Sequence, residues 1–260
     1  MATLERLFVY PIKSTAPVEL EQAQVTPLGL QHDRRYVITD ADGRFLTARR
    51  FPSMVLIQSR IEGDGLVIEA PGCAATELDP ETFPARYSDI TIWKDTVSAQ
   101  HCPAAVDTWF SDYLGIEAHC FYMGAASSRP ARGGGEVSFA DAAPLMLLSQ
   151  ASIDALNERL DQPVEVRNFR PNLLVSNTGA HAEDEWRRFT IGAAEFEFMW
   201  PCSRCVLTTV DPDTGSKRAD RQPLATLFEY RKEGNDALFG INVRVKTGGS
   251  IASGQPVRLI

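Results

Sequence analysis

The chain has 260 residues, of which 44% are hydrophobic and 23% are charged, with a formal net charge of −8 and a pI of about 5.1. This composition is typical of one large or two modest globular domains, and its acidic balance argues against nucleic acid as a partner. No apolar run is long enough to span a bilayer, and residues 1–7 lack the regions of a secretory signal.

The cysteine count bears on the compartment. There are five cysteines, an odd number for a disulfide framework in a chain of this size. Together with the absence of an export signal, this favours free thiols in a reducing compartment. We therefore expect a cytoplasmic protein.

The first half of the chain reads as short strands between turns. β-branched and aromatic residues recur in runs bounded by Pro, Gly and Asp. These runs predict strands at residues 7–10, 36–39, 55–57 and 66–68. Residues 40–43 predict a hairpin turn, and residues 108–114 a short helix. Short strands with frequent turns favour a small barrel or sandwich.

Residues 124–135 are small, polar and flexible in composition. They predict either a linker or a mobile loop over a site. The triple glycine at 133–135 is not followed by Lys-Ser or Lys-Thr, so it is not a nucleotide phosphate loop.

The second half mixes helix and strand. Ser149 is placed to cap a helix running through Leu160, and residues 224–231 predict another helix. Strands are expected at 172–176, 189–192, 195–200, 206–210, 243–246 and 257–260. Residues 211–215 superficially match a calcium loop, but its last position holds Gln222 instead of Glu, so we interpret them as a turn.

Cys202 and Cys205 form a Cys-x-x-Cys motif within residues 201–205. A structural zinc site normally needs two more ligands, and no second Cys or His pair has suitable spacing. A thioredoxin-like redox pair requires the start of a helix, whereas Pro201 precedes this motif and a β-rich run follows it. Two buried structural cysteines are a third interpretation, and the residues alone leave these alternatives open.

Residues 201–215, Pro-Cys-Ser-Arg-Cys-Val-Leu-Thr-Thr-Val-Asp-Pro-Asp-Thr-Gly, resemble the signature of the MOSC superfamily, named for the C-terminal domain of molybdenum cofactor sulfurase. Further segments at compatible spacing match the same family: residues 10–14, 33–36, 45–49, 139–144 and 168–172. The resemblance covers nearly the whole chain and extends to bacterial YcbX-type and mitochondrial amidoxime-reducing members. It implies a mixed α+β, β-rich fold, with an N-terminal β-barrel-like domain at 2–123, a linker or mobile loop at 124–137, and a MOSC β-barrel domain with peripheral helices at 138–260.

The resemblance also implies a molybdenum cofactor (Mo-molybdopterin) between the two domains. It assigns the protein's metal ligand to Cys205, whose thiolate is a soft donor that nearby Arg204 would help to ionise. Asp141 matches an acidic residue beside the metal, where it would orient water or relay a proton; an Asx turn or a helix cap is the alternative. The positions implied to contact the pterin or its phosphate are Lys13, Ser14, Arg34, Arg170, Asn172, Ser203 and Arg204.

The implied activity is reduction of small N-hydroxylated compounds (hydroxylamines, amidoximes or N-hydroxylated bases) to N–H products and water. The sequence has no Cys-x4-Cys-x2-Cys run for an iron–sulfur cluster, so we expect electrons from a separate donor protein of ferredoxin, flavin reductase or cytochrome type. Two other hypotheses remain: a sulfur carrier with a persulfide on Cys205, or a non-enzymatic cofactor-binding protein.

Overall fold

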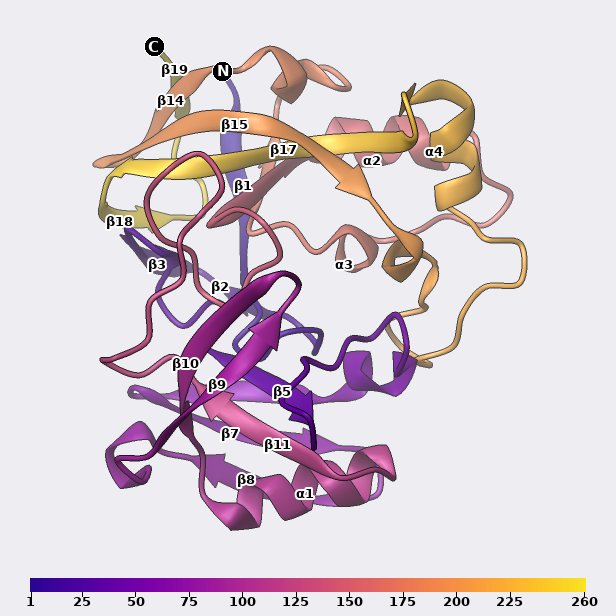
Figure 1. Ribbon diagram of the computed structural model, residues 1–260. Helices are drawn as coiled ribbons and strands as arrows, with labels where there is room; N and C mark the ends of the chain where they lie inside the picture. The colour runs from indigo at the N-terminus through magenta and orange to yellow at the C-terminus, as the bar shows by residue number, and fades with distance from the viewer.

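The computed structural model describes residues 1–260 and contains four sheets with peripheral helices (Figure 1). The largest sheet has nine strands in the order β19-β14-β15-β17-β12-β13-β1-β2, and β16 pairs with β17. Its strands are β1 (Thr3–Val9), β2 (Val18–Leu20), β12 (Leu145–Ser149), β13 (Leu173–Ser176), β14 (Arg188–Ile191), β15 (Ala194–Arg204), β16 (Lys232–Glu233), β17 (Asp236–Thr247) and β19 (Val257–Leu259). The fold is mixed α+β and β-rich, as the resemblance implies.

Three smaller sheets complete the strand structure. One joins β5 (Tyr36–Asp40), β11 (Ala118–Tyr122), β10 (Asp95–His101) and β9 (Tyr87–Ile92) in that order. The second joins β18 (Gly249–Ala252), β3 (Gln22–Thr26) and β4 (Gly29–Leu30), and the third joins β6 (Gln58–Glu62), β7 (Gly65–Ala70) and β8 (Cys73–Leu78).

The helices are short and peripheral. The α-helices are α1 (Ala104–Leu114), α2 (Gln150–Asn157), α3 (Val166–Phe169) and α4 (Leu224–Tyr230). The 3₁₀ helices are η1 (Pro52–Leu56), η2 (Pro80–Thr82), η3 (Ala182–Glu185) and η4 (Val206–Thr209). No helix combines the length and apolar character needed to cross a membrane.

The start of the chain pairs with strands from its second half. β1 lies antiparallel to β13, and β3 pairs with β18. Leu4, Leu7 and Val9 are buried in one core cluster with residues of β12, β13, β15 and β17. A separate cluster of equal size forms around β5, β7, α1 and β11. The domain ranges expected from the sequence remain a prediction, and the structure adds that β1, β3 and β4 pack with strands of the second half.

Most elements expected from the sequence are present, and two predicted strands are wrong. Residues 55–57 belong to η1 and its C-cap, and residues 206–210 form η4 and its C-cap. Ser149 caps α2 as expected, because its side chain accepts a hydrogen bond from the Ser152 amide, but that helix ends at Asn157. The turn at 211–215 is present: Asp211 Oδ1 accepts hydrogen bonds from the backbone amides of residues 213 and 214.

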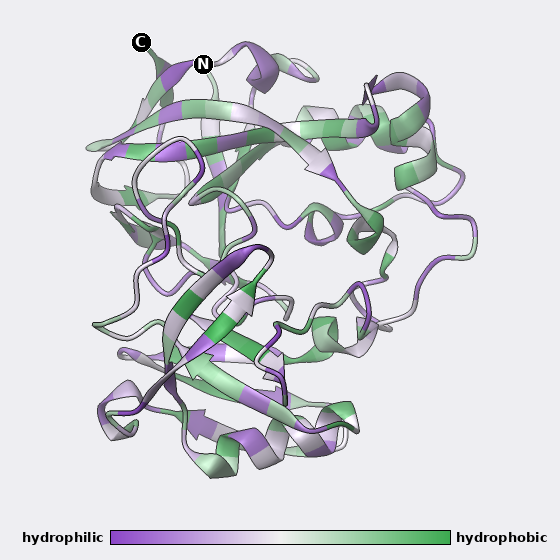
Figure 2. Ribbon diagram, viewed as in Figure 1, coloured by the Kyte–Doolittle hydropathy of each residue, from purple (hydrophilic) through white to green (hydrophobic).

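The fold leaves one large space where the two main cores approach each other. Figure 2 shows apolar ribbon concentrated within the upper and lower groups of strands. Loops from both groups, including residues 13–14, 47–49 and 140–143, reach the region between them. This region contains the cavity described next.

Candidate functional site

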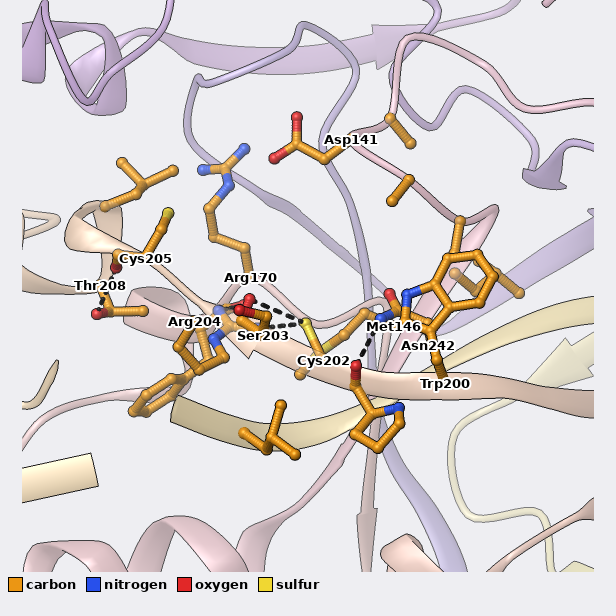
Figure 3. Close-up of a pocket in the computed structure, with 18 of the residues that line it drawn as sticks. Asp141, Met146, Arg170, Trp200, Cys202, Ser203, Arg204, Cys205, Thr208 and Asn242 are labelled. Atoms are coloured by element: carbon orange, nitrogen blue, oxygen red, sulfur yellow. Dashed lines mark hydrogen bonds between the residues drawn. The ribbon is translucent and has the colours of Figure 1, made fainter. Parts of the chain in front are cut away.

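A cavity of about 670 Å³ lies where the halves of the chain meet, and 28 residues line it. That volume is in the range of small-molecule and cofactor sites. All nine residues that the sequence singled out line this cavity: Lys13, Ser14, Arg34, Asp141, Arg170, Asn172, Ser203, Arg204 and Cys205. Figure 3 shows Asp141 across the cavity from residues 202–205, with Arg170 between them.

The end of β15 presents the Cys-x-x-Cys motif to the cavity. β15 pairs with β17 as far as Arg204, with irregular register between Pro201 and Ser203. The chain then leaves the sheet, and Cys205 becomes the N-cap residue of η4, in extended backbone conformation. The Cys205 carbonyl accepts hydrogen bonds from the amide and hydroxyl of Thr208, while its Sγ makes no hydrogen bond within the protein. The Cys205 thiol is therefore free to act as a ligand.

Cys202 has a different environment from Cys205. It packs against a buried cluster that includes Phe169 and Phe239. Arg204 Nη1 donates to Cys202 Sγ at 2.9 Å, and Arg204 Nη2 donates to the Phe169 carbonyl at 2.6 Å. The guanidinium expected to act on Cys205 thus contacts the sulfur of Cys202, as Figure 3 shows.

Arg204 and Ser203 extend this edge of the cavity. Arg204 Nε is buried and has no hydrogen-bond partner in the protein. No carboxylate forms an ion pair with Arg204, whose other two nitrogens contact Cys202 and Phe169. The Ser203 hydroxyl donates to Asp236 Oδ1 at 2.5 Å. An acceptor supplied by a bound group would satisfy the unpaired Arg204 nitrogen, since buried donors are rarely left unpaired.

Lys13 and Asp141 form an ion pair across the cavity. Lys13 is only 5% exposed, and its Nζ also donates to the Phe139 carbonyl at 2.7 Å. Burial lowers the pKa of Lys13 to about 8, against the opposing influence of Asp141. Burial works to raise the pKa of Asp141, but Lys13 outweighs it and the net direction is downward. The Asp141 side chain is 60% exposed, so solvent screens part of this effect.

Arg34 and Arg170 surround the ring of Tyr10, with guanidinium carbons 4.2 and 4.1 Å from its centroid. Arg34 Nη1 donates to Asp33 Oδ2 at 2.6 Å and to Asn172 Oδ1 at 3.1 Å. Burial lowers the pKa of Arg170 to about 10, which leaves it protonated at neutral pH. Burial raises the pKa of Tyr10 to about 12, so its hydroxyl stays neutral. The two cations are therefore held in place by a neutral aromatic ring.

Three of the expected cofactor contacts have left-handed backbone conformation. The φ angles are 75° at Ser14, 47° at Arg34 and 57° at Arg170. Each such non-glycine residue costs on the order of 1 kcal/mol or more, and such residues concentrate at binding sites. The rest of the fold maintains these conformations and thereby fixes where their amides and side chains lie.

The lining fits an anionic, metal-bearing cofactor. Six basic residues line the cavity (Lys13, Arg34, Arg49, Arg132, Arg170, Arg204) against three acidic ones (Asp141, Glu233, Asp236), although the whole chain carries −8. Guanidinium groups bind phosphate in bidentate fashion, and a thiolate is a ligand for soft metals. The free Cys205 thiol and the unpaired Arg204 Nε thus match a phosphate-bearing group with a metal.

The cavity residues that were not singled out from the sequence include Arg49, Arg132, Asn168 and Trp200. Arg49 lies within residues 45–49, a segment that matched the family, and this match was the only sequence feature that could have indicated a role in the site. Asn168 is a buried amide that ties α3 to η4. Trp200 was assigned only to a strand, and Arg132 only to a loop. No local pattern indicates that these two lie together.

Comparison with known proteins gives matches over nearly the whole chain. The model of the MOSC N-terminal beta barrel domain matches residues 1–117, and that of the MOSC domain matches residues 134–258. Mitochondrial amidoxime reducing component 2 of Bos taurus is 33% identical over 281 residues, which cover 99% of this chain and 83% of that protein. Mitochondrial amidoxime-reducing component 1 is 34% identical in Mus musculus and 31% in Homo sapiens, covering 100% of this chain and 83% of each relative.

Proposed function

Because the chain belongs to the MOSC family, with a MOSC N-terminal β-barrel domain followed by a MOSC domain, we propose that it is a molybdenum-cofactor-dependent oxidoreductase. We propose further that it reduces N-hydroxylated compounds such as hydroxylamines, amidoximes or N-hydroxylated bases. Relatives with about one third identity over the full chain are named amidoxime reducing components, which supports this class of reaction.

The observation that carries the proposal is the convergence of its residues on one cavity. The candidate ligand Cys205, the cations Arg34 and Arg170, and the Lys13–Asp141 pair come from distant parts of the sequence and line the same space. A structural role for each residue alone would not require this convergence. A soft ligand, an anion-binding cluster and a proton-holding pair are together what a reductase with this cofactor needs.

In the proposed mechanism, Cys205 Sγ would hold the metal, and Arg34, Arg170 and Ser14 would bind the phosphate and pterin, with Asn172 accepting a hydrogen bond that positions Arg34. When bound, the cofactor supplies the two electrons that cleavage of an N–O bond requires. The reaction also consumes two protons, because the N-hydroxyl group becomes N–H and water. These protons must reach the departing oxygen from groups on the protein or from solvent.

The Lys13–Asp141 pair is the proposed proton source. Lys13 Nζ is protonated at neutral pH because its pKa is about 8, and a donor with a pKa near the working pH transfers protons efficiently. Asp141 orients the ammonium and stabilises its charge by the ion pair. The ordinary expectation that a carboxylic acid donates the proton is disfavoured here, because the pKa of Asp141 is lowered.

We propose that electrons come from a separate donor protein of ferredoxin, flavin reductase or cytochrome type. The relatives' names call them components, which agrees with a reaction shared among several proteins. All five cysteines are free thiols, which supports placing the protein in a reducing compartment such as the cytoplasm.

The test is turnover by cofactor-loaded protein. The protein is purified from a host that makes the cofactor, its molybdenum and pterin content is measured, and reduced viologen is supplied with benzamidoxime or a hydroxylamine. We expect formation of the N–H product at a rate proportional to the molybdenum content. Fully loaded protein that reduces none of a range of N-hydroxylated compounds would contradict the reductase proposal. A persulfide found on Cys205 instead of molybdenum would favour a sulfur carrier.

A further inference from the structure

Trp200 forms a wall of the cavity at the end away from Cys205. Its indole lies beside Asn242 in Figure 3, and the two residues are register partners across β15 and β17. Both line the cavity, and the Asn242 amide donates to the Pro201 carbonyl at 3.4 Å. The side chain of Trp200 is therefore carried by the large sheet, which holds it in a fixed position.

Arg132 covers this indole from the loop at 124–137. Its guanidinium carbon lies 5.3 Å from the centroid of the Trp200 ring. Arg132 is exposed, lines the cavity and has no carboxylate partner. A cation in this position can bind an anionic group without first breaking an ion pair.

The loop that carries Arg132 is held at two points. Arg129 is 3% exposed, and it donates to Asp95 Oδ2 at 2.8 Å and to the Ser138 carbonyl at 3.1 Å. Arg244 Nη1 donates to the Gly133 carbonyl at 3.0 Å, directly after Arg132. These contacts position the Arg132 backbone against β15, so its stacking on Trp200 is built into the fold.

Exposure separates Arg132 from the other five basic residues of the cavity. Lys13 is 5% exposed, and Arg34, Arg49, Arg170 and Arg204 are partly buried, whereas Arg132 is exposed and Trp200 beside it is half-buried. A resident cofactor favours buried contacts, while a substrate must enter from solvent and return to it in every turnover. The Trp200–Arg132 wall has the accessibility of a substrate site, and an indole offers a planar surface on which an aromatic ring stacks.

We propose that Trp200 and Arg132 bind the part of the substrate remote from its N–OH group. The wall selects N-hydroxylated compounds in which that part is a planar aromatic ring with an anionic substituent. The indole packs against the ring, and the guanidinium pairs with the anion. This inference rests on the proposed reductase function and names the substrate class for it.

Equilibrium binding tests the proposal without turnover. Calorimetry on cofactor-loaded protein, with no electron donor present, gives Kd values for three amidoximes: 4-carboxybenzamidoxime, benzamidoxime and acetamidoxime. For Arg132→Gln we expect about a fivefold weaker affinity for the carboxylate compound alone. For Trp200→Leu we expect about a fivefold weaker affinity for both aromatic compounds and no change for acetamidoxime, with Trp200→Phe restoring most of the loss. Arg258→Gln, an equal charge change on exposed β19, is the matched control.

Three results would overturn the proposal. One is unchanged affinity for all three compounds in both variants. Another is a loss of affinity for acetamidoxime in the variants as large as the loss for the aromatic compounds. The third is loss of pterin from Trp200→Leu protein, because the wall would then bind the cofactor. If the wild-type protein binds the three compounds with the expected selectivity but reduces none of them, the role of Trp200 and Arg132 in binding is supported and the reductase proposal fails instead.

Discussion

The Lys13–Asp141 ion pair joins the two halves of the chain at the level of single residues. Lys13 follows β1, while Asp141 lies 128 positions later in the loop before β12, and their side chains meet in the cavity. The Trp93 indole also donates to Asp141 Oδ1, at 3.3 Å. The pair is thus held from several elements, which suits groups whose protonation matters to a reaction.

The pH dependence of the reaction follows from the direction of these shifts. Lys13 has a pKa of about 8, so its proton is present below that pH and is lost as the pH rises through it. We expect kcat/KM to fall on the alkaline side with a midpoint near pH 8. In Asp141→Asn the midpoint should move to lower pH, because the Asp141 carboxylate raises the pKa of Lys13. The pH profile with reduced viologen as electron donor measures both.

The matched control is Asp184→Asn, since Asp184 also pairs with a partly buried cation, Arg231, and neither residue lines the cavity. Its midpoint should equal that of the wild type. If Asp141→Asn is too slow for kinetics, titration of Lys13 followed by NMR of labelled lysine reports the same shift. A profile that stays flat from pH 7 to about 9.5, or a midpoint unmoved by Asp141→Asn, would show that Lys13 is not the proton source.

At the scale of elements, the position of Cys205 depends on η4 and on its tie to α3. The buried Asn168 side chain donates to the carbonyls of Thr208 and Val210, both at 3.2 Å. Loss of this amide would leave two buried carbonyls without a partner, at a cost of about 1–3 kcal/mol. The same change would loosen the segment that holds the candidate ligand.

We therefore expect Asn168→Ala to lower both the melting temperature and the molybdenum content. Ser149→Ala removes the N-cap of α2 and should destabilise the protein by about 1 kcal/mol, but α2 does not border the cavity. Thermal unfolding and metal analysis of the two variants separate the effects. Equal metal content in both, at comparable stability, would mean that the α3–η4 tie does not position Cys205.

Sequence patterns predicted the strands in which polar and apolar residues clearly alternate. They missed the short helices whose conformation depends on packing. The strand pair at 189–192 and 195–200 alternates in burial and is present as β14 and β15. The short apolar runs at 55–57 and 206–210 gave no usable period, so strand and buried helix could not be told apart. Pro52 near the start of η1 and the side-chain bonds of Thr208 and Thr209 within η4 favour 3₁₀ turns instead.

The candidate site was predictable only where it resembles the family. Single residues such as Lys13 or Arg170 have no local pattern that distinguishes a ligand from a surface charge. The ion pair of Lys13 with Asp141 and the packing of Arg170 on Tyr10 both depend on contacts between segments that are distant in the sequence. Trp200 and Arg132 are 68 positions apart, so their stacking follows from the path of the loop at 124–137.

At the scale of the whole molecule, the cavity collects positive charge in an acidic protein. Six basic side chains line it against three acidic ones, and like charges at close range repel one another. Ties between the halves offset part of this repulsion: Arg170 Nη1 donates to the Thr15 carbonyl at 2.6 Å, and Arg34 to Asn172. An anionic group bound in the cavity would offset the remaining repulsion between the basic side chains.

We expect cofactor loading to raise the melting temperature, because a ligand that binds only the folded protein stabilises it by mass action. The cofactor-free protein should also be stabilised by added phosphate, which partly neutralises the same cations, whereas the loaded protein should not. Differential scanning calorimetry of both forms, with and without phosphate and at constant ionic strength, measures this. Equal melting temperatures for the two forms would argue against a cofactor bound between the halves.

The assignment of Cys205 as the metal ligand is tested most directly by the molybdenum and pterin content of two alanine variants. Cys205→Ala removes a thiol with no other bond in the protein, and Cys202→Ala removes the neighbouring thiol that Arg204 contacts. Both proteins are purified in parallel with the wild type from a host that makes the cofactor. We predict that Cys205→Ala loses nearly all its molybdenum while Cys202→Ala keeps most of it. Normal molybdenum in folded Cys205→Ala would contradict the account.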